Sequence, residues 1–149
     1  MKYTRRNNIR NILLNVARGT LPSFGGEDYD KHWNYLNFKG KKILDLGADY
    51  GSTASYFLWQ GAKQVIAVEG NEEFAEALRK NFRKEPRIIP TELFIKSPED
   101  IDNLISKYHP DIVKVDIEEY ELNLLGCQNI EKVKEWLIEC HNRQIRNKN

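Results

Sequence analysis

Apolar positions in this chain alternate between short continuous runs and runs that recur every three or four residues. The first pattern is typical of buried β-strands and the second of helices with one buried face. From residue 41 onward the two patterns follow one another in turn. Strands are expected at Lys42–Leu46, Gln64–Glu69, within 88–95, at 111–117 and at 136–140.

Helices are expected in the intervals between these strands. A glycine, Gly61, ends the first helix, and Asn71 is placed to cap the second. Ser97 followed by Pro98 is typical of a helix start, because proline fits the first helical position. The predicted helices therefore cover 52–60, 71–82 and 98–108, with further helical residues around 122–133.

This alternation predicts an α/β fold, a doubly wound and mainly parallel sheet with helices on both faces. We expect the strand order 3-2-1-4-5, with the third strand at an edge because Pro90 cannot donate a backbone hydrogen bond. Residues 1–40 are expected to form a helical extension and connector, since Ile9, Ile12, Leu13 and Val16 share one helical face. Residues 41–149 form the predicted domain.

The turn after the first strand carries the candidate chemistry. Gly47 and Gly51 allow the backbone to turn and to approach a ligand closely. Glu69 ends the second strand, where a carboxylate can accept hydrogen bonds from ribose hydroxyls. A dinucleotide site requires glycine where this chain has Asp49, and Asp45 adds a second carboxylate. Two acids favour a cationic ligand, S-adenosylmethionine, over a nicotinamide cofactor.

Four segments in the same order resemble FkbM-type methyltransferases. Asp45-Leu-Gly-Ala-Asp-Tyr-Gly51 resembles Asp-x-Gly-Ala-Asn-x-Gly, and Val68-Glu-Gly-Asn71 is similar to Phe-Glu-Pro-Asn. Lys114-Val-Asp-Ile-Glu-Glu-Tyr-Glu121 resembles Lys-Ile-Asp-Val-Glu-Gly-Ala-Glu, and Glu139-Cys-His141 resembles the Glu-x-His end of the fifth strand. The resemblance implies the class I methyltransferase (Rossmann-like) fold, shortened after the fifth strand and lacking the usual last two strands.

Carried over by position, the resemblance assigns roles to individual residues. Asp45 and the turn through Gly47, Ala48, Asp49 and Gly51 would hold the methionine part of S-adenosylmethionine. Glu69 would hold the ribose with Asn71 beside it, and Ser97 or Glu99 would face the adenine. Asp116 would contact the donor, and Asp116, Glu118 and His141 are the candidates for orienting the acceptor or taking its proton.

Each assignment has a structural alternative. Asp45 and Glu69 are also typical of strand-end acids that cap neighbouring helices. Glu118 is equally placed to cap the following helix, and His141 fits an exposed position near the terminus. Lys114 in a central strand is expected to extend its ammonium group from the start of the strand into water.

Composition and charge limit the metals, partners and cellular compartment to be expected. The net charge is +1, and two cysteines without a Cys-x-x-Cys pair give no expectation of a metal site or a disulfide framework. No apolar run is long enough for a membrane span or signal peptide, so a cytoplasmic protein is expected. The basic residues near both ends lack interleaved aromatic residues, so a nucleic-acid partner is not expected.

The sequence therefore predicts an S-adenosylmethionine-dependent methyltransferase that acts on an oxygen of a sugar or another small hydroxylated acceptor. A non-catalytic donor-binding or interaction subunit is the first alternative, and a nucleic-acid or protein methyltransferase the second. The sheet edge beyond the fifth strand is expected to be covered by a second copy of the chain or by a partner protein.

Overall fold

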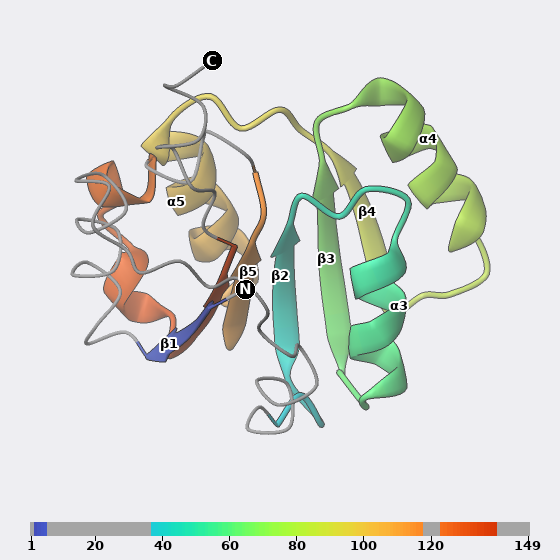
Figure 1. Ribbon diagram of the computed structural model, residues 1–149, viewed down its shortest axis with the longest axis horizontal. Coiled ribbons are helices and arrows are strands. Elements are labelled where there is room, and N and C mark those ends of the chain that lie inside the picture. The colour runs from blue at the N-terminus through green and yellow to red at the C-terminus, as the bar shows by residue number, and fades with distance from the viewer. Residues whose placement is uncertain (1, 6–36, 118–122, 140–149) are drawn as a thin grey trace, which may run out of the picture.

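Strand-forming runs and helices alternate in the computed structural model as the hydrophobic pattern predicts (Figure 1). The structure describes residues 2–5, 37–117 and 123–139. The strands are β1 (Lys2–Arg5), β2 (Lys42–Leu46), β3 (Gln64–Glu69), β4 (Ile88–Glu92), β5 (Ile112–Val115) and β6 (Glu135–Ile138). The helices are α3 (Ser52–Trp59), α4 (Glu72–Asn81), α5 (Pro98–Tyr108) and the 3-10 turn η2 (Ile130–Lys132).

The strands form one sheet in the order β1-β6-β5-β2-β3-β4. The pairs β4–β3, β3–β2, β2–β5 and β5–β6 are all parallel. These five strands confirm the predicted order 3-2-1-4-5, and β4, which contains Pro90, lies at an edge as expected. Parallel strands that share one direction place all of their carboxyl ends along one side of the sheet.

The strand β1 is the main difference from the prediction. It pairs antiparallel with β6, with Tyr3 opposite Leu137 and Thr4 opposite Trp136. The chain itself therefore occupies the edge beyond the fifth parallel strand, where we expected a second copy or a partner. Unpaired backbone groups of β6 explain why a strand is favourable there. The predicted helix around residues 9–16 and most of the predicted connector lie outside the described residues.

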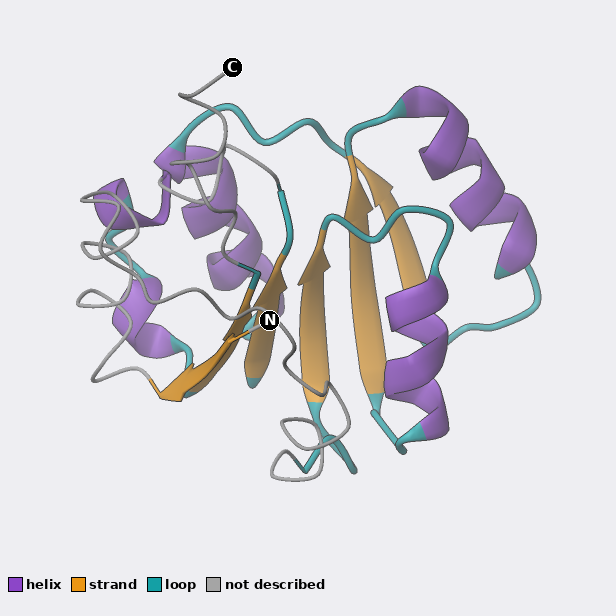
Figure 2. Ribbon diagram, in the orientation of Figure 1, coloured by secondary structure: helices purple, strands orange, loops and turns teal. Residues whose placement is uncertain are grey.

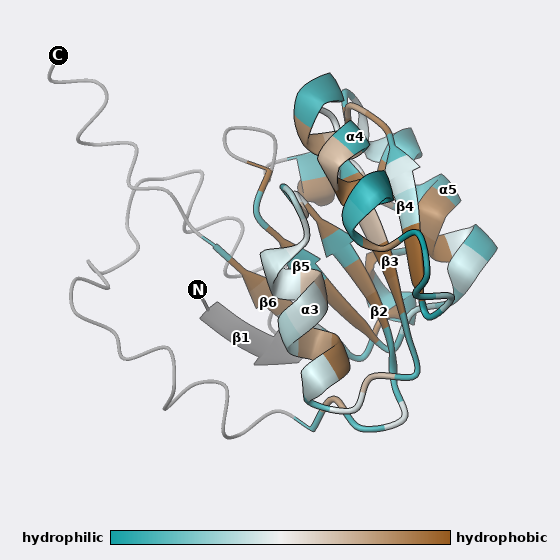
Figure 3. Cartoon of the chain, turned by 90° about the vertical axis from the view of Figure 1, so that its right-hand side faces the viewer, coloured by the Kyte–Doolittle hydropathy of each residue, from teal (hydrophilic) through white to brown (hydrophobic). Residues whose placement is uncertain are grey.

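Buried side chains form two hydrophobic layers, one on each face of the sheet. Figure 2 shows the strands with helices on both sides of them. On one face Leu44 and Leu46 pack with Ile101, Leu104 and other residues of α5. Neighbouring positions on the same strands turn to the other face, where Ile43 and Val65 pack with α3 and α4 residues, among them Ala54, Phe57 and Leu78. Figure 3 shows the same division, with apolar strands inside and polar outer surfaces on the helices.

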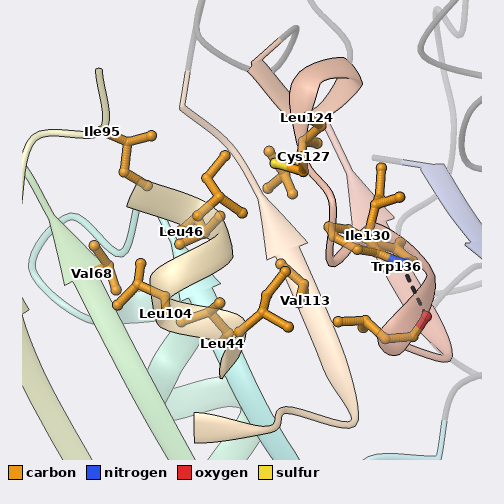
Figure 4. Close-up of a cluster of buried hydrophobic side chains, with 14 of the residues drawn as sticks. Leu44, Leu46, Val68, Ile95, Leu104, Val113, Leu124, Cys127, Ile130 and Trp136 are labelled. Atoms are coloured by element: carbon orange, nitrogen blue, oxygen red, sulfur yellow. Dashed lines mark hydrogen bonds between the residues drawn. The ribbon is translucent and has the colours of Figure 1, made fainter. Parts of the chain in front are cut away.

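The segment between β5 and β6 contains short 3-10 turns at 123–126 and at η2, where longer helical structure was expected. Asp102 on α5 anchors this segment, because its carboxylate accepts the backbone N–H groups of Gln128 at 2.9 Å and Asn129 at 2.8 Å. The indole of Trp136 is fully buried beside this segment, and its Nε1 donates to the carbonyl of Val133 at 3.3 Å (Figure 4).

Within the described part of the chain, no helix combines the length and the hydropathy that crossing a membrane requires.

Candidate functional site

A pocket of about 590 Å³ lies at the carboxyl ends of four adjacent strands. Its lining residues follow β5, β2, β3 and β4 in turn, and the start of α4 completes the wall. This is the side of a parallel α/β sheet at which ligands bind, next to the point where the strand order reverses. The lining residues are Gly47, Asp49, Val68, Glu69, Gly70, Asn71, Glu72, Phe74, Leu93, Phe94, Ile95, Asp116 and Ile117.

The turn after β2 brings the backbone of the pocket floor close to β5. Gly47 has φ +85°, and a Cβ atom there would lie 1.9 Å from the carbonyl oxygen of Asp116. Both reasons exclude a side chain at this position. The backbone N–H groups of Gly47 and Ala48 donate to the carbonyl of Val68, each at 3.0 Å. The floor is therefore tied to both neighbouring strands.

Glu69 is held in place by two backbone groups. Its Oε1 accepts the N–H of Asp49 at 2.9 Å, and its Oε2 accepts the N–H of Asn71 at 2.8 Å. The side chain is buried, with 8% of its surface exposed, and it lines the pocket. A carboxylate has about four acceptor sites, so each oxygen keeps capacity for one donor from a ligand. Two adjacent acceptors of this kind fit the paired hydroxyls of a ribose.

Asn71 itself performs the capping role that the sequence predicts. It is the N-cap of α4, and its Oδ1 accepts the backbone N–H of Phe74 at 3.1 Å. Since the Asn71 backbone also donates to Glu69, the start of α4 and the end of β3 are linked. Asn71, and not Glu69, caps the first turn of α4 with its side chain. Glu69 accepts the backbone N–H of this cap residue, and its carboxylate still lines the pocket.

Asp45 does not face the pocket but is paired with a buried cation. Its Oδ1 lies 3.0 Å from the Nζ of Lys114, and its Oδ2 accepts the hydroxyl of Thr53 at 2.6 Å. Lys114 also donates to the carbonyl of Gly47 at 2.8 Å. Both charged side chains are almost fully buried. The expectation that Lys114 extends into water is therefore wrong: its ammonium lies beneath the turn and binds it.

Carboxylates dominate the charge around the pocket. Burial raises the pKa of Asp49 above its ordinary value, and the charges of Glu69, Asp116 and Asp45 raise it further against the opposing effect of Lys114. Burial alone would lower the pKa of Lys114, but the charges of Asp45, Asp116 and Asp49 outweigh it and hold that pKa above its ordinary value. A raised carboxyl pKa indicates a site that gains from a cationic ligand.

The side of the pocket below β4 is apolar and aromatic. Leu93, Phe94 and Ile95 follow that strand, and Phe94 is about half exposed. Gly70 allows Phe94 to approach, since a Cβ on Gly70 would lie 2.8 Å from the Phe94 ring. Phe74 of α4 also lines the pocket, and its ring meets that of Tyr50 edge to face, with ring centroids 4.6 Å apart. Apolar and aromatic lining of this kind suits a flat heteroaromatic group.

The structure brings together only part of the predicted set. Among the predicted residues, Gly47, Asp49, Glu69, Asn71 and Asp116 line the pocket. Asp45, Ala48 and Gly51 are buried and do not line the pocket. Ser97 is not a lining residue, and its backbone N–H donates to Asp100 at the start of α5. Its predicted contact with adenine, like that of Glu99, stays a prediction.

Two catalytic candidates, Glu118 and His141, lie outside the described residues. The ion pair of Lys114 and the aromatic lining formed by Phe74 and Phe94 were not predicted from the sequence. The Lys114 pair had a signal in the sequence, because a cation and an acid each stand in a strand that was predicted to be central. The aromatic lining had none, since both residues fit helix and strand packing equally well.

Comparison with known proteins gives a relative in sequence and partial matches to solved structures. No protein-family model matches the chain, so membership of the FkbM-type family stays a prediction. Fibrillarin from Aeropyrum pernix, in complex with natively bound S-adenosyl-L-methionine, is 22% identical with a TM-score of 0.48 over 66% of this chain and 43% of its own. An S-adenosylmethionine dependent methyltransferase from Mesorhizobium loti is 17% identical with a TM-score of 0.44 over 60% of this chain and 39% of its own.

The chain thus spans less than half the length of either solved structure. Uncharacterized protein 158B of Sulfolobus islandicus rod-shaped virus 1 is 30% identical over 116 residues, which are 76% of this chain and 69% of that protein. This identity extends over most of both sequences, and the chain therefore belongs to the same family as Uncharacterized protein 158B of Sulfolobus islandicus rod-shaped virus 1.

Proposed function

We propose that the chain binds S-adenosylmethionine and transfers its methyl group to a hydroxyl oxygen of a small acceptor, such as a sugar. The observation that carries the proposal is the position of Glu69. Its two carboxylate oxygens are fixed by backbone N–H groups and line a pocket at the carboxyl ends of the strands. Preorganised acceptors of this kind bind ribose hydroxyls without the cost of ordering the side chain.

The order of the lining residues fits the three parts of this donor. The apolar residues Leu93–Ile95 suit the adenine, Glu69 suits the ribose, and the turn from Gly47 to Asp49 with Asp116 suits the methionine part. These groups follow β4, β3, β2 and β5, which are consecutive in the sheet. The pocket volume of about 590 Å³ lies within the range usual for small-molecule sites.

Charge also favours this donor over a dinucleotide. Asp49, Glu69, Glu72 and Asp116 are acidic, and no lysine or arginine is among the described residues that line the pocket. Besides burial, the negative charges of Glu69, Asp116 and Asp45 raise the pKa of Asp49, so a pyrophosphate would meet repulsion from these groups, whereas an ammonium or sulfonium group would be attracted. Asp45 is already neutralised by Lys114, so Asp49 and Asp116 are the carboxylates proposed to meet the cationic arm.

The donor would supply a methyl group on a positively charged sulfur. In the transfer a lone pair of the acceptor oxygen forms the new C–O bond, the C–S bond breaks with its electron pair on sulfur, and the hydroxyl proton leaves to a base. Asp116 lines the pocket beside the proposed methionine site, which supports it as the base that receives this proton. Alignment of the two reactants supplies most of the acceleration in such a displacement.

Calorimetry with S-adenosylmethionine and with NAD tests the donor, and Glu92 offers a matched control. Glu92 also ends a strand, but its exposed carboxylate is paired with Arg79 of α4 at 3.0 Å and does not line the pocket. We expect the wild-type protein to bind S-adenosylmethionine and not NAD. Glu69→Gln should weaken binding by about tenfold or more, and Glu92→Gln should leave it unchanged. Equal affinities in the two variants would refute the proposed site.

Transfer is tested separately, with a radiolabelled methyl donor and a panel of sugars and small alcohols. Label in a product that disappears with Asp116→Asn, measured at donor concentrations that saturate the variant, would support the role of Asp116 as a base beyond its contact with the donor. Donor binding without any labelled product would favour a non-catalytic donor-binding subunit.

A further inference from the structure

The parallel strands carry opposite charges at their two ends. Lys41, Lys63, Arg87 and Lys134 directly precede β2, β3, β4 and β6, and Asp111 precedes β5. At the other ends, Glu69 and Glu92 close β3 and β4, and acids also follow β5 and β6. Because the strands are parallel, the basic residues lie together along the edge of the sheet where the strands begin. The acidic residues lie together along the edge where the strands end.

The loops at the amino ends of the strands strengthen this polarity. The segments 37–42, 59–64, 82–88, 107–112 and 130–135 contain ten lysine or arginine residues and four acidic residues. At least three of these acids are already paired. Glu85 is paired with Arg87, Glu135 is paired with Lys41, and Asp111 accepts the backbone N–H of Lys42. The exposed lysines 39, 63, 84 and 134 therefore dominate the field at this edge, which we call the basic edge.

An exposed aromatic residue stands on the basic edge. Trp59 ends α3 and is 81% exposed. Two residues further on, Gly61 accepts the backbone N–H of Gly40 at 2.9 Å, so the loops that carry Lys39 and Lys63 meet beside it. Figure 1 shows the lower end of α3 next to the start of β3. The indole of Trp59 meets the ring of Tyr56, with centroids 6.4 Å apart, and is otherwise largely in water. An exposed aromatic side chain on an edge rich in lysines is typical of sites for single-stranded nucleic acid.

We propose that the basic edge binds single-stranded nucleic acid, with phosphates on its lysines and a base stacked on Trp59. Strands lie about 4.8 Å apart, so the loops before β4, β3 and β2 present their exposed lysines, Lys84, Lys63 and Lys39, in a row along which a phosphate backbone can lie. Six strand residues separate this edge from the pocket, which is about 20 Å at 3.3 Å per residue. The surface anchors a nucleic acid away from the donor pocket, so this inference goes beyond the proposed methyl transfer.

Fluorescence anisotropy with a labelled twelve-nucleotide oligonucleotide tests the proposal, with an abasic oligonucleotide of equal length as the second probe. Binding should weaken as salt rises, and Lys39→Gln combined with Lys63→Gln should reduce the salt slope by about 0.7 for each phosphate that is no longer neutralised. Trp59→Ala should weaken binding of the normal oligonucleotide by about tenfold and leave the abasic one unchanged. Lys96→Gln, at the carboxyl ends of the strands, is the charge-matched control for either single substitution, Lys39→Gln or Lys63→Gln, and should have no effect.

Three results would overturn the proposal: no binding at low salt, equal weakening with Lys96→Gln, or equal binding of the two probes with no effect of Trp59→Ala. Competition by polyglutamate at the same charge concentration would indicate an acidic protein surface as the partner and would also overturn it. Glu69→Gln should bind the oligonucleotide like wild type. A failure of the protein to bind S-adenosylmethionine and a failure to bind the oligonucleotide are thus observed in separate measurements.

Discussion

Lys114 and Asp45 lie directly opposite each other on β5 and β2, with 3.0 Å between the ammonium nitrogen and a carboxylate oxygen. The same ammonium donates to the carbonyl of Gly47 at 2.8 Å, so one buried cation joins the two central strands to the turn that forms the pocket floor. Isolated charges are costly to bury, and each of these two makes the other tolerable. The ion pair therefore fixes the position of the turn that forms the pocket floor, which non-directional hydrophobic contacts alone would not do.

Lys114→Met should destabilise the fold strongly, because it leaves the Asp45 carboxylate buried without its counter-charge. The expected loss in the free energy of unfolding is about 3–5 kcal/mol, measured by urea denaturation. The double variant Lys114→Met with Asp45→Leu should recover much of this loss, since no charge then remains buried. A double variant as unstable as the single one would show that the pair is not the source of the effect.

The pH dependence of stability should show the same pair. The pKa of Lys114 is raised above its ordinary value of 10.5, so its folded state holds the proton more tightly than the unfolded chain. The stabilisation is then fully present below pH 10.5 and is lost as the pH rises through the folded pKa. The urea concentration at the midpoint of unfolding should therefore fall more steeply between about pH 9 and about pH 12 for the wild type than for the double variant.

Asp49 should behave in the opposite sense. Its folded pKa is raised, so ionisation of this residue costs stability at neutral pH, and the cost disappears as the pH falls through that pKa. Asp49→Asn should therefore stabilise the ligand-free protein at neutral pH, with a gain that shrinks in acid. Asparagine also tolerates the positive φ of this residue, but that part of the gain does not depend on pH. Thermal unfolding across the acid range distinguishes the two contributions.

A cationic ligand should reverse the preference of Asp49. Affinity for S-adenosylmethionine should fall as the pH falls through the raised pKa of Asp49, because the protonated group no longer attracts the ammonium. Calorimetry in two buffers of different ionisation enthalpy should detect proton release on binding in that range. In Asp49→Asn this proton release should be absent. If the Asp49→Asn variant still releases protons when it binds S-adenosylmethionine, the protons come from another carboxyl group.

Much of the fold was predictable because parallel strands buried on both faces form continuous apolar runs. Val65–Val68 is such a run, and Ile43–Leu46 is one that only Asp45 interrupts, while Pro90 marked an edge strand. β1 was not predictable on the same grounds. Its four residues have no apolar run, and their pairing with β6 depends on an edge that exists only after the rest of the sheet has formed.

The site was predictable where a residue type and the end of a strand coincide, as at Glu69 and Asp116. It was not predictable where the neighbour comes from another strand. Asp45 was assigned to the ligand because its sequence position fits, and only the register between β2 and β5 places Lys114 against it. The basic edge was missed for the same reason, since its charges are distributed over separate loops and gather only in the parallel sheet.

The close backbone approach in the pocket floor gives a prediction with an internal control. Gly47 and Gly40 both have positive φ, at +85° and +73°. A Cβ on Gly47 would lie 1.9 Å from the Asp116 carbonyl oxygen, whereas a Cβ on Gly40 would meet nothing within 4 Å. Gly40→Ala should therefore cost about 1–2 kcal/mol, the strain of the left-handed backbone alone.

Gly47→Ala carries the same backbone strain and in addition must move β2 away from the end of β5. We expect a clearly larger decrease in the free energy of unfolding than for Gly40→Ala, measured by urea denaturation, together with loss of donor binding in calorimetry. Gly40→Ala should bind the donor like wild type, because Gly40 lies at the opposite edge of the sheet. If both variants are destabilised equally and both keep the donor, the approach of Gly47 to Asp116 is not what shapes the pocket.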